Sequence, residues 1–281
     1  MERMTDIATA KLVASLEHPR FEVIPAKGVE EQIAHLPAGA TVTITSSPGK
    51  GIDATLDLAA RLAAEGFAVV PHIAARLVAG VGHLEAVLRR FDELRLRDMF
   101  VVAGDAAQPA GPFEGAAALL AEMARLGHGL DDVGITGYPE SHAFISDETT
   151  IQTMFDKAPY ATYIVSQICY DPAVTAAWVG AVRDRGVDLP IHIGIPGVVD
   201  RARLARISFK VGLGDSARFL RKQGGVVTKL LAGYTPDDLV ERLGPMVADE
   251  TQRISGWHLF TFNEVERTER WRRQLLDRLA S

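Results

Sequence analysis

The stretch Phe100-Val-Val-Ala-Gly-Asp105 decides the fold class of this chain. It is an apolar run that ends in a glycine and a carboxylate. A strand of a parallel sheet that is buried on both faces reads as such a continuous apolar run. Polar groups that follow these strands gather at one edge of the sheet, where α/β folds place their chemistry. We therefore predict a buried strand with Asp105 just past its carboxyl end.

Seven other runs have the same character, and segments with helical periodicity separate nearly all of them. The eight predicted strands are 21–24, 41–45, 67–71, 99–103, 132–136, 162–165, 189–193 and 257–261. Eight βα units in 281 residues are what a (β/α)8 TIM barrel needs. We predict a single catalytic domain over residues 1–281, with extra helices between the seventh and eighth strands. A doubly wound sheet is the competing architecture.

Composition narrows the class of protein. The chain is 47% hydrophobic and 23% charged, as globular proteins usually are. A net charge of −6 argues against nucleic acid or an anionic membrane as the main partner. With one cysteine the chain forms no intrachain disulfide. Residues 1–10 do not resemble a signal peptide, and no apolar run approaches the roughly 18 residues of a membrane span. We expect a cytoplasmic protein that acts on a small molecule and is compatible with homo-oligomer formation.

In a barrel, residues at the ends of the strands converge on one mouth. The polar residues placed there are Glu22, Thr45, His72, Asp105, Tyr138, Glu140, His142, Gln167, His192 and His258. This set is rich in acceptors and neutral donors and poor in arginine. It suits a planar heterocycle with several ring nitrogens better than a lone phosphate.

Single residues in this set allow more than one interpretation. Glu22 lies inside an apolar run, where an unpaired carboxylate is costly, so a functional role is favoured. His72 follows a proline and could simply end its strand. His192 could point into the barrel or into the helix layer. His258 lies near the start of its predicted strand, which favours a structural role. Lys157 ends a predicted helix, where a cation also stabilises the helix dipole.

Seven motifs occur in an order that resembles the methylenetetrahydrofolate reductases. They are Phe21-Glu22-Val-Ile-Pro25, Pro71-His72, Gly104-Asp105, Tyr138-Pro-Glu-Ser-His142, Ser166-Gln167-Ile-Cys-Tyr-Asp171, His192-Ile-Gly-Ile-Pro-Gly197 and His258-Leu-Phe-Thr-Phe-Asn263. Each motif alone is weak, but together they span nearly the whole chain. The resemblance implies a TIM-barrel oxidoreductase of one-carbon metabolism and methionine biosynthesis that acts on CH–NH donors. It implies reduction of 5,10-methylenetetrahydrofolate to 5-methyltetrahydrofolate, usually with FAD and with NADH or NADPH.

The resemblance also implies roles for single residues. Glu22 matches the glutamate that helps protonate the folate so that its five-membered ring opens to an iminium. Asp105 matches an aspartate that contacts the pterin and tunes the flavin, and Gln167 matches a pterin-binding glutamine. The positions that match FAD contacts are Thr45, His72, Tyr138, His142 and Lys157.

Four positions depart from the family pattern. Ala103 stands where the family usually has an arginine, and Ala143 stands where it has a proline. Thr150 and Thr153 fall near positions that usually hold Asp and Asn. These losses remove polar contacts expected to hold FAD. Some actinobacterial relatives work without flavin and pass hydride directly from NADH to the folate. Both FAD-mediated and direct transfer therefore remain open.

Three rival functions remain. A metal-dependent barrel hydrolase or lyase could draw ligands from His72, Asp105, Glu140, His142 and His192. No His-x-His pair closes the first strand, however, so we predict no metal site. A second rival is a folate- or flavin-binding barrel without turnover. A third is a related enzyme that transfers methyl groups from the same folate pocket.

Overall fold

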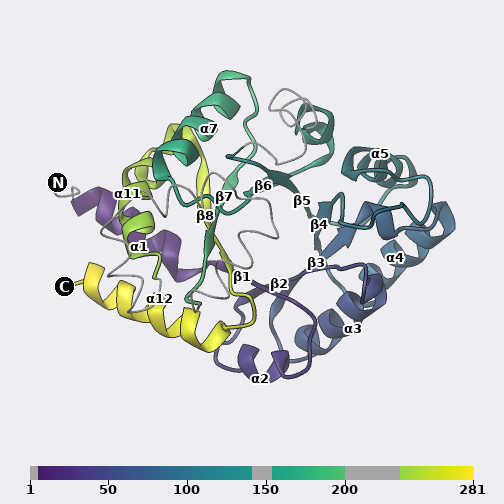
Figure 1. Ribbon diagram of the computed structural model, residues 1–281, viewed down its shortest axis with the longest axis horizontal. Coiled ribbons are helices and arrows are strands. Elements are labelled where there is room, and N and C mark those ends of the chain that lie inside the picture. Colours follow the sequence, from purple (N-terminus) through teal and green to yellow (C-terminus); the bar gives the residue numbers. More distant parts are fainter. Residues whose placement is uncertain (1–5, 141–153, 200–234) are drawn as a thin grey trace.

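The computed structural model describes residues 6–140, 154–199 and 235–281. Eight parallel strands pair in sequence order, and β8 closes onto β1 to form a barrel. Helices surround this barrel (Figure 1). The strands are β1 (Arg20–Val23), β2 (Thr41–Ile44), β3 (Ala68–Ala74), β4 (Asp98–Val102), β5 (Asp132–Gly137), β6 (Tyr163–Ser166), β7 (Ile191–Pro196) and β8 (Ile254–Phe260). The predicted (β/α)8 TIM barrel is confirmed, and the doubly wound alternative is wrong.

The helices of the barrel follow from apolar stripes that face the strands. They are α1 (Asp6–Glu17), α2 (Val29–Ile33), α3 (Gly51–Ala64), α4 (Val81–Glu93), α5 (Ala116–Leu126), α7 (Pro172–Asp184), α11 (Asp237–Ala248) and α12 (Val265–Leu279). The described residues also form short 3-10 turns, namely η1 (Ala75–Leu77), η2 (Ala158–Tyr160) and η3 (Glu250–Gln252). Helix α7 begins as its sequence predicts, because the Asp171 side chain accepts a hydrogen bond from the Ala173 amide and Pro172 takes the first position.

Helix α1 is a feature that the sequence did not predict. It packs against α11 and α12 beside β8, so segments from both ends of the chain lie together (Figure 1). The Trp257 indole of β8 donates to the Ser15 hydroxyl at 2.8 Å. Between β7 and β8, where the sequence predicts extra helices, the structure has α11, and residues 200–234 lie outside the described residues.

Two strand boundaries differ from the prediction in a way that matters for function. Strand β3 continues to Ala74, and β8 begins at Ile254. His72 and His258 were read as lying at or near the ends of their strands. Both instead lie within them, buried inside the barrel. A polar residue in an apolar run usually indicates the end of a buried strand. The interior of this barrel is itself polar, so here the polar residues lie within the strands.

Alternation along each strand separates two environments. Phe21 and Val23 of β1 point outward and join the large apolar core beneath the helices, as do Val42 and Ile44 of β2. Inside the barrel, where bulky aliphatic residues usually dominate, a smaller apolar cluster is interleaved with charged and aromatic groups. The interior therefore carries an unusual load of polar groups.

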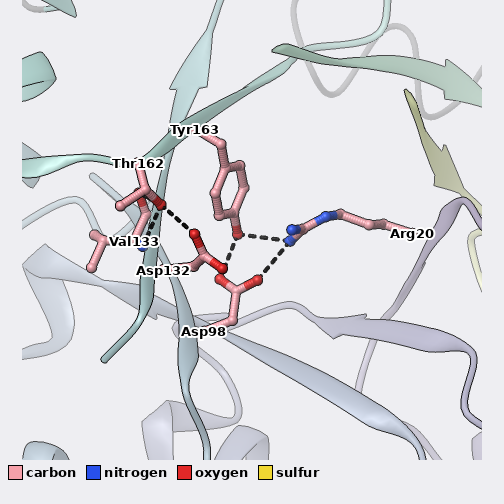
Figure 2. Close-up of polar contacts among 6 residues, drawn as sticks. All are labelled: Arg20, Asp98, Asp132, Val133, Thr162 and Tyr163. Atoms are coloured by element: carbon pink, nitrogen blue, oxygen red, sulfur yellow. Dashed lines mark hydrogen bonds and ion pairs between the residues drawn. The ribbon is translucent and has the colours of Figure 1, made fainter. Parts of the chain in front are cut away.

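The most extensive of these polar contacts joins Arg20, Asp98 and Tyr163 across the barrel (Figure 2). One guanidinium nitrogen of Arg20 lies 2.9 Å from an Asp98 carboxylate oxygen and 2.8 Å from the Tyr163 hydroxyl. The Tyr163 hydroxyl donates to the other Asp98 oxygen at 2.8 Å. The ring of Tyr163 fits because residue 134 is glycine, where a Cβ would lie 2.3 Å from the ring. The three groups thus link β1, β4 and β6 near their amino ends.

Burial raises the pKa of the Asp98 carboxyl, and Arg20 and the Tyr163 hydroxyl oppose that rise. Asp98→Ala would leave the Arg20 charge without its carboxylate partner in a largely buried site. We expect this change to lower the free energy of unfolding by about 3–5 kcal/mol. Asp57→Ala is the control, because Asp57 pairs with Arg90 on the surface, where such a pair contributes about 0–1 kcal/mol. Urea unfolding measures both, and equal losses in the two variants would contradict the expectation.

Candidate active site

Four residues predicted at the mouth of the barrel lie there, and Lys157 lies near them. Thr45, Asp105, Tyr138 and Gln167 follow closely after the carboxyl ends of β2, β4, β5 and β6. Lys157 lies in the connection between β5 and β6 and reaches back to the end of β5. Because all eight strands are parallel, these positions share one end of the barrel.

Glu22 points into the barrel from β1. Its carboxyl Oε2 lies 3.2 Å from Nε2 of His258, and its side chain keeps 14% of its surface exposed. Burial raises the pKa of this carboxyl to about 7, against a smaller opposing effect of His72. Glu22 is therefore an acid that can hold a proton near neutral pH and still be reached from outside.

His258 is the partner that the sequence missed. It lies directly across from Arg20 in the β1–β8 ladder, so a cation is its neighbour on the adjacent strand. Burial, with a smaller contribution from Arg20, lowers the pKa of His258 to about 3. The imidazole is therefore neutral, and its Nε2 accepts a hydrogen bond when Glu22 is protonated. The sequence signal that His258 faces the barrel interior is its alternation with apolar neighbours along β8. This signal can be used only when the start of the strand is known.

His72 lies in the same layer and is also neutral. Burial lowers its pKa to about 4, and its ring packs 4.7 Å from the ring of Phe100. Its centroid is 6.4 Å from that of His258. Near neutral pH, Glu22 is thus the group of these three that exchanges a proton. His192 completes the set: its ring and that of Tyr163 form a T-shaped contact inside the barrel, so His192 points into the barrel.

Several polar atoms in this layer have no hydrogen-bond partner among the described residues. They include the Thr43 hydroxyl, Nε2 of His72 and Nδ1 of His258. A buried group left in this way costs about 1–3 kcal/mol. Polar groups kept at such a cost are more typical of a functional site than of a structural core.

Asp105 lies on an exposed loop whose conformation is fixed by Gly104 and by contacts with Arg76. Gly104 has a φ of +91°, and a Cβ there would lie 2.8 Å from that of Ala74, so glycine is required. The Arg76 guanidinium donates to the backbone carbonyls of Ala106 and Ala107 at 2.7 and 2.8 Å. Arg76 therefore holds the loop that presents Asp105, a role that the sequence did not indicate.

Lys157 and Tyr138 both lie near the carboxyl end of β5. The Lys157 ammonium is buried and donates to the Thr136 carbonyl at 3.2 Å, and burial lowers its pKa to about 8. Burial also raises the pKa of Tyr138, to which the nearby Asp105 contributes. A buried cation at the mouth can bind an anionic group of a ligand.

Gln167 follows β6, and its side-chain carbonyl accepts from the Ile168 amide at 2.8 Å. Beside it lies an apolar cluster that the sequence did not single out. The buried members are Ile168, Tyr170 and Val199, and Phe260 and Phe262 pack against them. This cluster offers an apolar wall beside the polar groups, which is the usual make-up of a site for a planar ligand.

The remaining predictions have separate outcomes. His142 lies outside the described residues. Glu140 accepts a hydrogen bond from the Cys169 thiol at 3.3 Å. Among the described residues, no three His, Cys, Asp or Glu side chains are placed to hold a metal ion. In the same part of the chain, no helix is long and apolar enough to cross a membrane.

Solved structures similar to this chain show only distant likeness. An oxaloacetate acetylhydrolase with a bound inhibitor has 11% identity and a TM-score of 0.49, covering 98% of this chain and 86% of that chain. A GH18 chitinase from Cycas revoluta has 12% identity and a TM-score of 0.49, covering 94% and 100%. A putative lyase/mutase from Burkholderia cenocepacia has 16% identity and a TM-score of 0.44, covering 85% and 97%.

A match to a protein-family model identifies the family of this chain. The model described as methylenetetrahydrofolate reductase matches residues 19–213, which is more than half of the chain. The matched residues include Glu22, His72, Asp105 and Gln167. The chain belongs to the methylenetetrahydrofolate reductase family.

Proposed function

We propose that this protein reduces 5,10-methylenetetrahydrofolate to 5-methyltetrahydrofolate with a nicotinamide nucleotide as the hydride donor. The observation that carries the proposal is the buried Glu22 carboxyl against neutral His258, with its pKa raised to about 7. A barrel that only bound folate would have no use for a protonated carboxyl held at such a cost. Family membership supports a reductase of this type.

The reaction adds one proton and one hydride to the substrate. Glu22 gives its proton to the nitrogen that leaves the methylene carbon, so the five-membered ring opens and an iminium remains. Hydride from the reduced nicotinamide then adds to the iminium carbon, which becomes the methyl group. The nicotinamide is left oxidised, and Glu22 recovers a proton from solvent. His258 stays neutral throughout and accepts the hydrogen bond of the protonated carboxyl.

The other mouth residues would bind and orient the two ligands. Gln167 and Asp105 supply an amide and a carboxylate for the polar edge of the pterin, and the Phe260–Phe262 wall supplies apolar contact for its rings. Lys157 supplies a cation for an anionic part of the nucleotide. Such alignment of donor, acceptor and acid is what the protein has to provide, because the nicotinamide carries the hydride chemistry.

Two features of the described residues argue against the flavin contacts that the family resemblance implies. His72, expected to contact FAD, is buried in the barrel against Phe100. Ala103 stands where the family usually has an arginine that is expected to contact FAD. We therefore propose direct hydride transfer from the nicotinamide to the folate, and no step passes through a flavin.

Glu22→Gln removes the proton donor and keeps the shape of the side chain. We expect kcat to fall on the order of 10²–10⁴-fold, the usual contribution of a general acid, with folate binding kept within a few-fold. NADH oxidation in the presence of methylenetetrahydrofolate measures this, with isothermal titration for folate binding. Glu241→Gln, at an exposed position on α11, is the control. Near-normal turnover in Glu22→Gln would remove this role from Glu22.

The raised pKa of Glu22 also predicts the pH dependence. The acid must be protonated to act, so its active fraction is high below pH 7 and falls as pH rises through about 7. We expect kcat/KM for the folate to decline roughly tenfold per pH unit above that point. A profile that stays flat to about pH 9 would mean that another group supplies the proton.

Direct transfer predicts a colourless enzyme. The purified protein should lack flavin absorption bands, oxidise NADH only when methylenetetrahydrofolate is present, and show no increase in rate when FAD is added. Bound flavin that is reduced by NADH and reoxidised by the folate would show that hydride passes through FAD instead. A colourless protein without folate-dependent oxidation, even with FAD, would overturn the proposed reaction.

A further inference from the structure

The turn that follows β8, Thr261 to Asn263, lies against the end of β1 where the barrel closes. The backbone ladder between β1 and β8 runs from Arg20 opposite His258 to Glu22 opposite Phe260. Beyond that point side chains of the turn take over the pairing. Glu22 is therefore the last residue of β1 that pairs with β8, while Val23 still pairs with Ile44 of β2.

Thr261 holds the backbone of Glu22 directly. Its side chain is fully buried, and its hydroxyl donates to the Glu22 carbonyl at 2.5 Å. The Thr261 amide donates to the same carbonyl at 3.3 Å. The Thr261 hydroxyl in turn accepts from the Asn263 amide at 3.1 Å, which joins the two residues of the turn.

Asn263 holds the backbone of Ile24, which lies two residues after Glu22. Its side-chain carbonyl accepts from the Ile24 amide at 2.8 Å, and its side-chain NH2 donates to the Ile24 carbonyl at 2.9 Å. One amide side chain thus replaces both bonds that a neighbouring strand would make. Ile24 itself is 40% exposed, so burial of its side chain does not explain this pairing.

The turn keeps these contacts in a strained backbone. Phe262 has a φ of +51° and Asn263 a φ of +66°, two consecutive non-glycine residues in the left-handed region. For a bulky residue such as Phe262 this conformation is a genuine outlier. Strain of this kind persists where the surroundings fix it, and it clusters at functional sites. Here four hydrogen bonds to Glu22 and Ile24 fix it.

We infer that Thr261 and Asn263 are positioning residues that fix Glu22 against His258 for proton delivery. The inference rests on the proposed function of Glu22. The carbonyl of Glu22 and both backbone groups of Ile24 are tied, so the backbone that carries the Glu22 side chain is fixed at the point where β1 leaves β8. Misplacement by about 1 Å can cost 10²-fold in rate, which is why an acid needs such support.

Thr261→Val is the first test, since it removes the hydroxyl and keeps the shape. We expect kcat to fall about tenfold or more while KM for the folate changes less than about twofold, and we expect Thr261→Ser to restore kcat. Thr175→Val is the matched control: Thr175 is equally buried, and its hydroxyl donates to the Asp171 carbonyl within its own helix. Folded Thr261→Val with unchanged kcat at a temperature well below its Tm would overturn the inference.

Asn263→Gly separates strain from positioning. Glycine tolerates positive φ, so this change relieves the backbone but removes the amide that holds Ile24. We expect faster hydrogen exchange of the Ile24 amide and a lower kcat, even if Tm is unchanged or higher. A merely structural turn would predict retained kcat in this variant, and that result would overturn the role of Asn263.

A readout without turnover distinguishes failure of this inference from failure of the proposed reaction. The Glu22 carboxyl can be titrated by 13C NMR in wild type and Thr261→Val. The charged or titratable groups around it are His258 from β8, His72 from β3 and Arg20 from β1. If wild type lacks folate-dependent NADH oxidation, the reaction is wrong. The positioning inference then stands only if the Glu22 midpoint moves in Thr261→Val, and an unmoved midpoint overturns it.

Discussion

The contact on which this barrel depends is the buried group formed by Arg20, Asp98 and Tyr163. It joins three strands that are far apart in the sequence, and each of its members would be costly to bury alone. A cation held in this way can sit beneath the functional layer without an uncompensated charge. Its presence opposes protonation of His258 and His72, which lie in the layer above. The floor of the barrel and the chemistry of its mouth are therefore linked by electrostatics.

That link gives Glu22 its distinct character. In the same small volume, burial acts in opposite directions on acids and bases: it raises the pKa of the carboxyl and lowers that of the imidazoles. The result is a neutral carboxylic acid beside a neutral base, close to the pH at which cells operate. When such an acid protonates the substrate, a carboxylate and a cationic substrate form side by side and the net charge of the site does not change, which suits a reaction that begins with protonation of a substrate nitrogen.

The barrel itself could be predicted from the sequence because buried parallel strands are written as apolar runs, and runs such as Phe100–Val102 stand out from the helices around them. The mouth residues Thr45, Asp105, Tyr138 and Gln167 followed from the same pattern. The interior could not be predicted, since a pairing such as Arg20 with Asp98 or Tyr163 depends on strands 78 and 143 residues apart. His258 was assigned to structure because a polar residue looked like the edge of a strand. The roles of Arg76 and of the turn after β8 depend on backbone geometry that no residue type reveals.

The alternation of side chains along β1 has a consequence for how this family member can change over time. Arg20 and Glu22 face the interior, and Phe21 and Val23 face the helices. Insertion or loss of one residue in this strand would exchange the two sets, placing two charges in the apolar layer and two apolar groups where the proton is handled. Point substitutions can accumulate here one at a time, but changes in length cannot. The length of β1 is therefore constrained, and we expect variation in chain length only in the loops on either side of it.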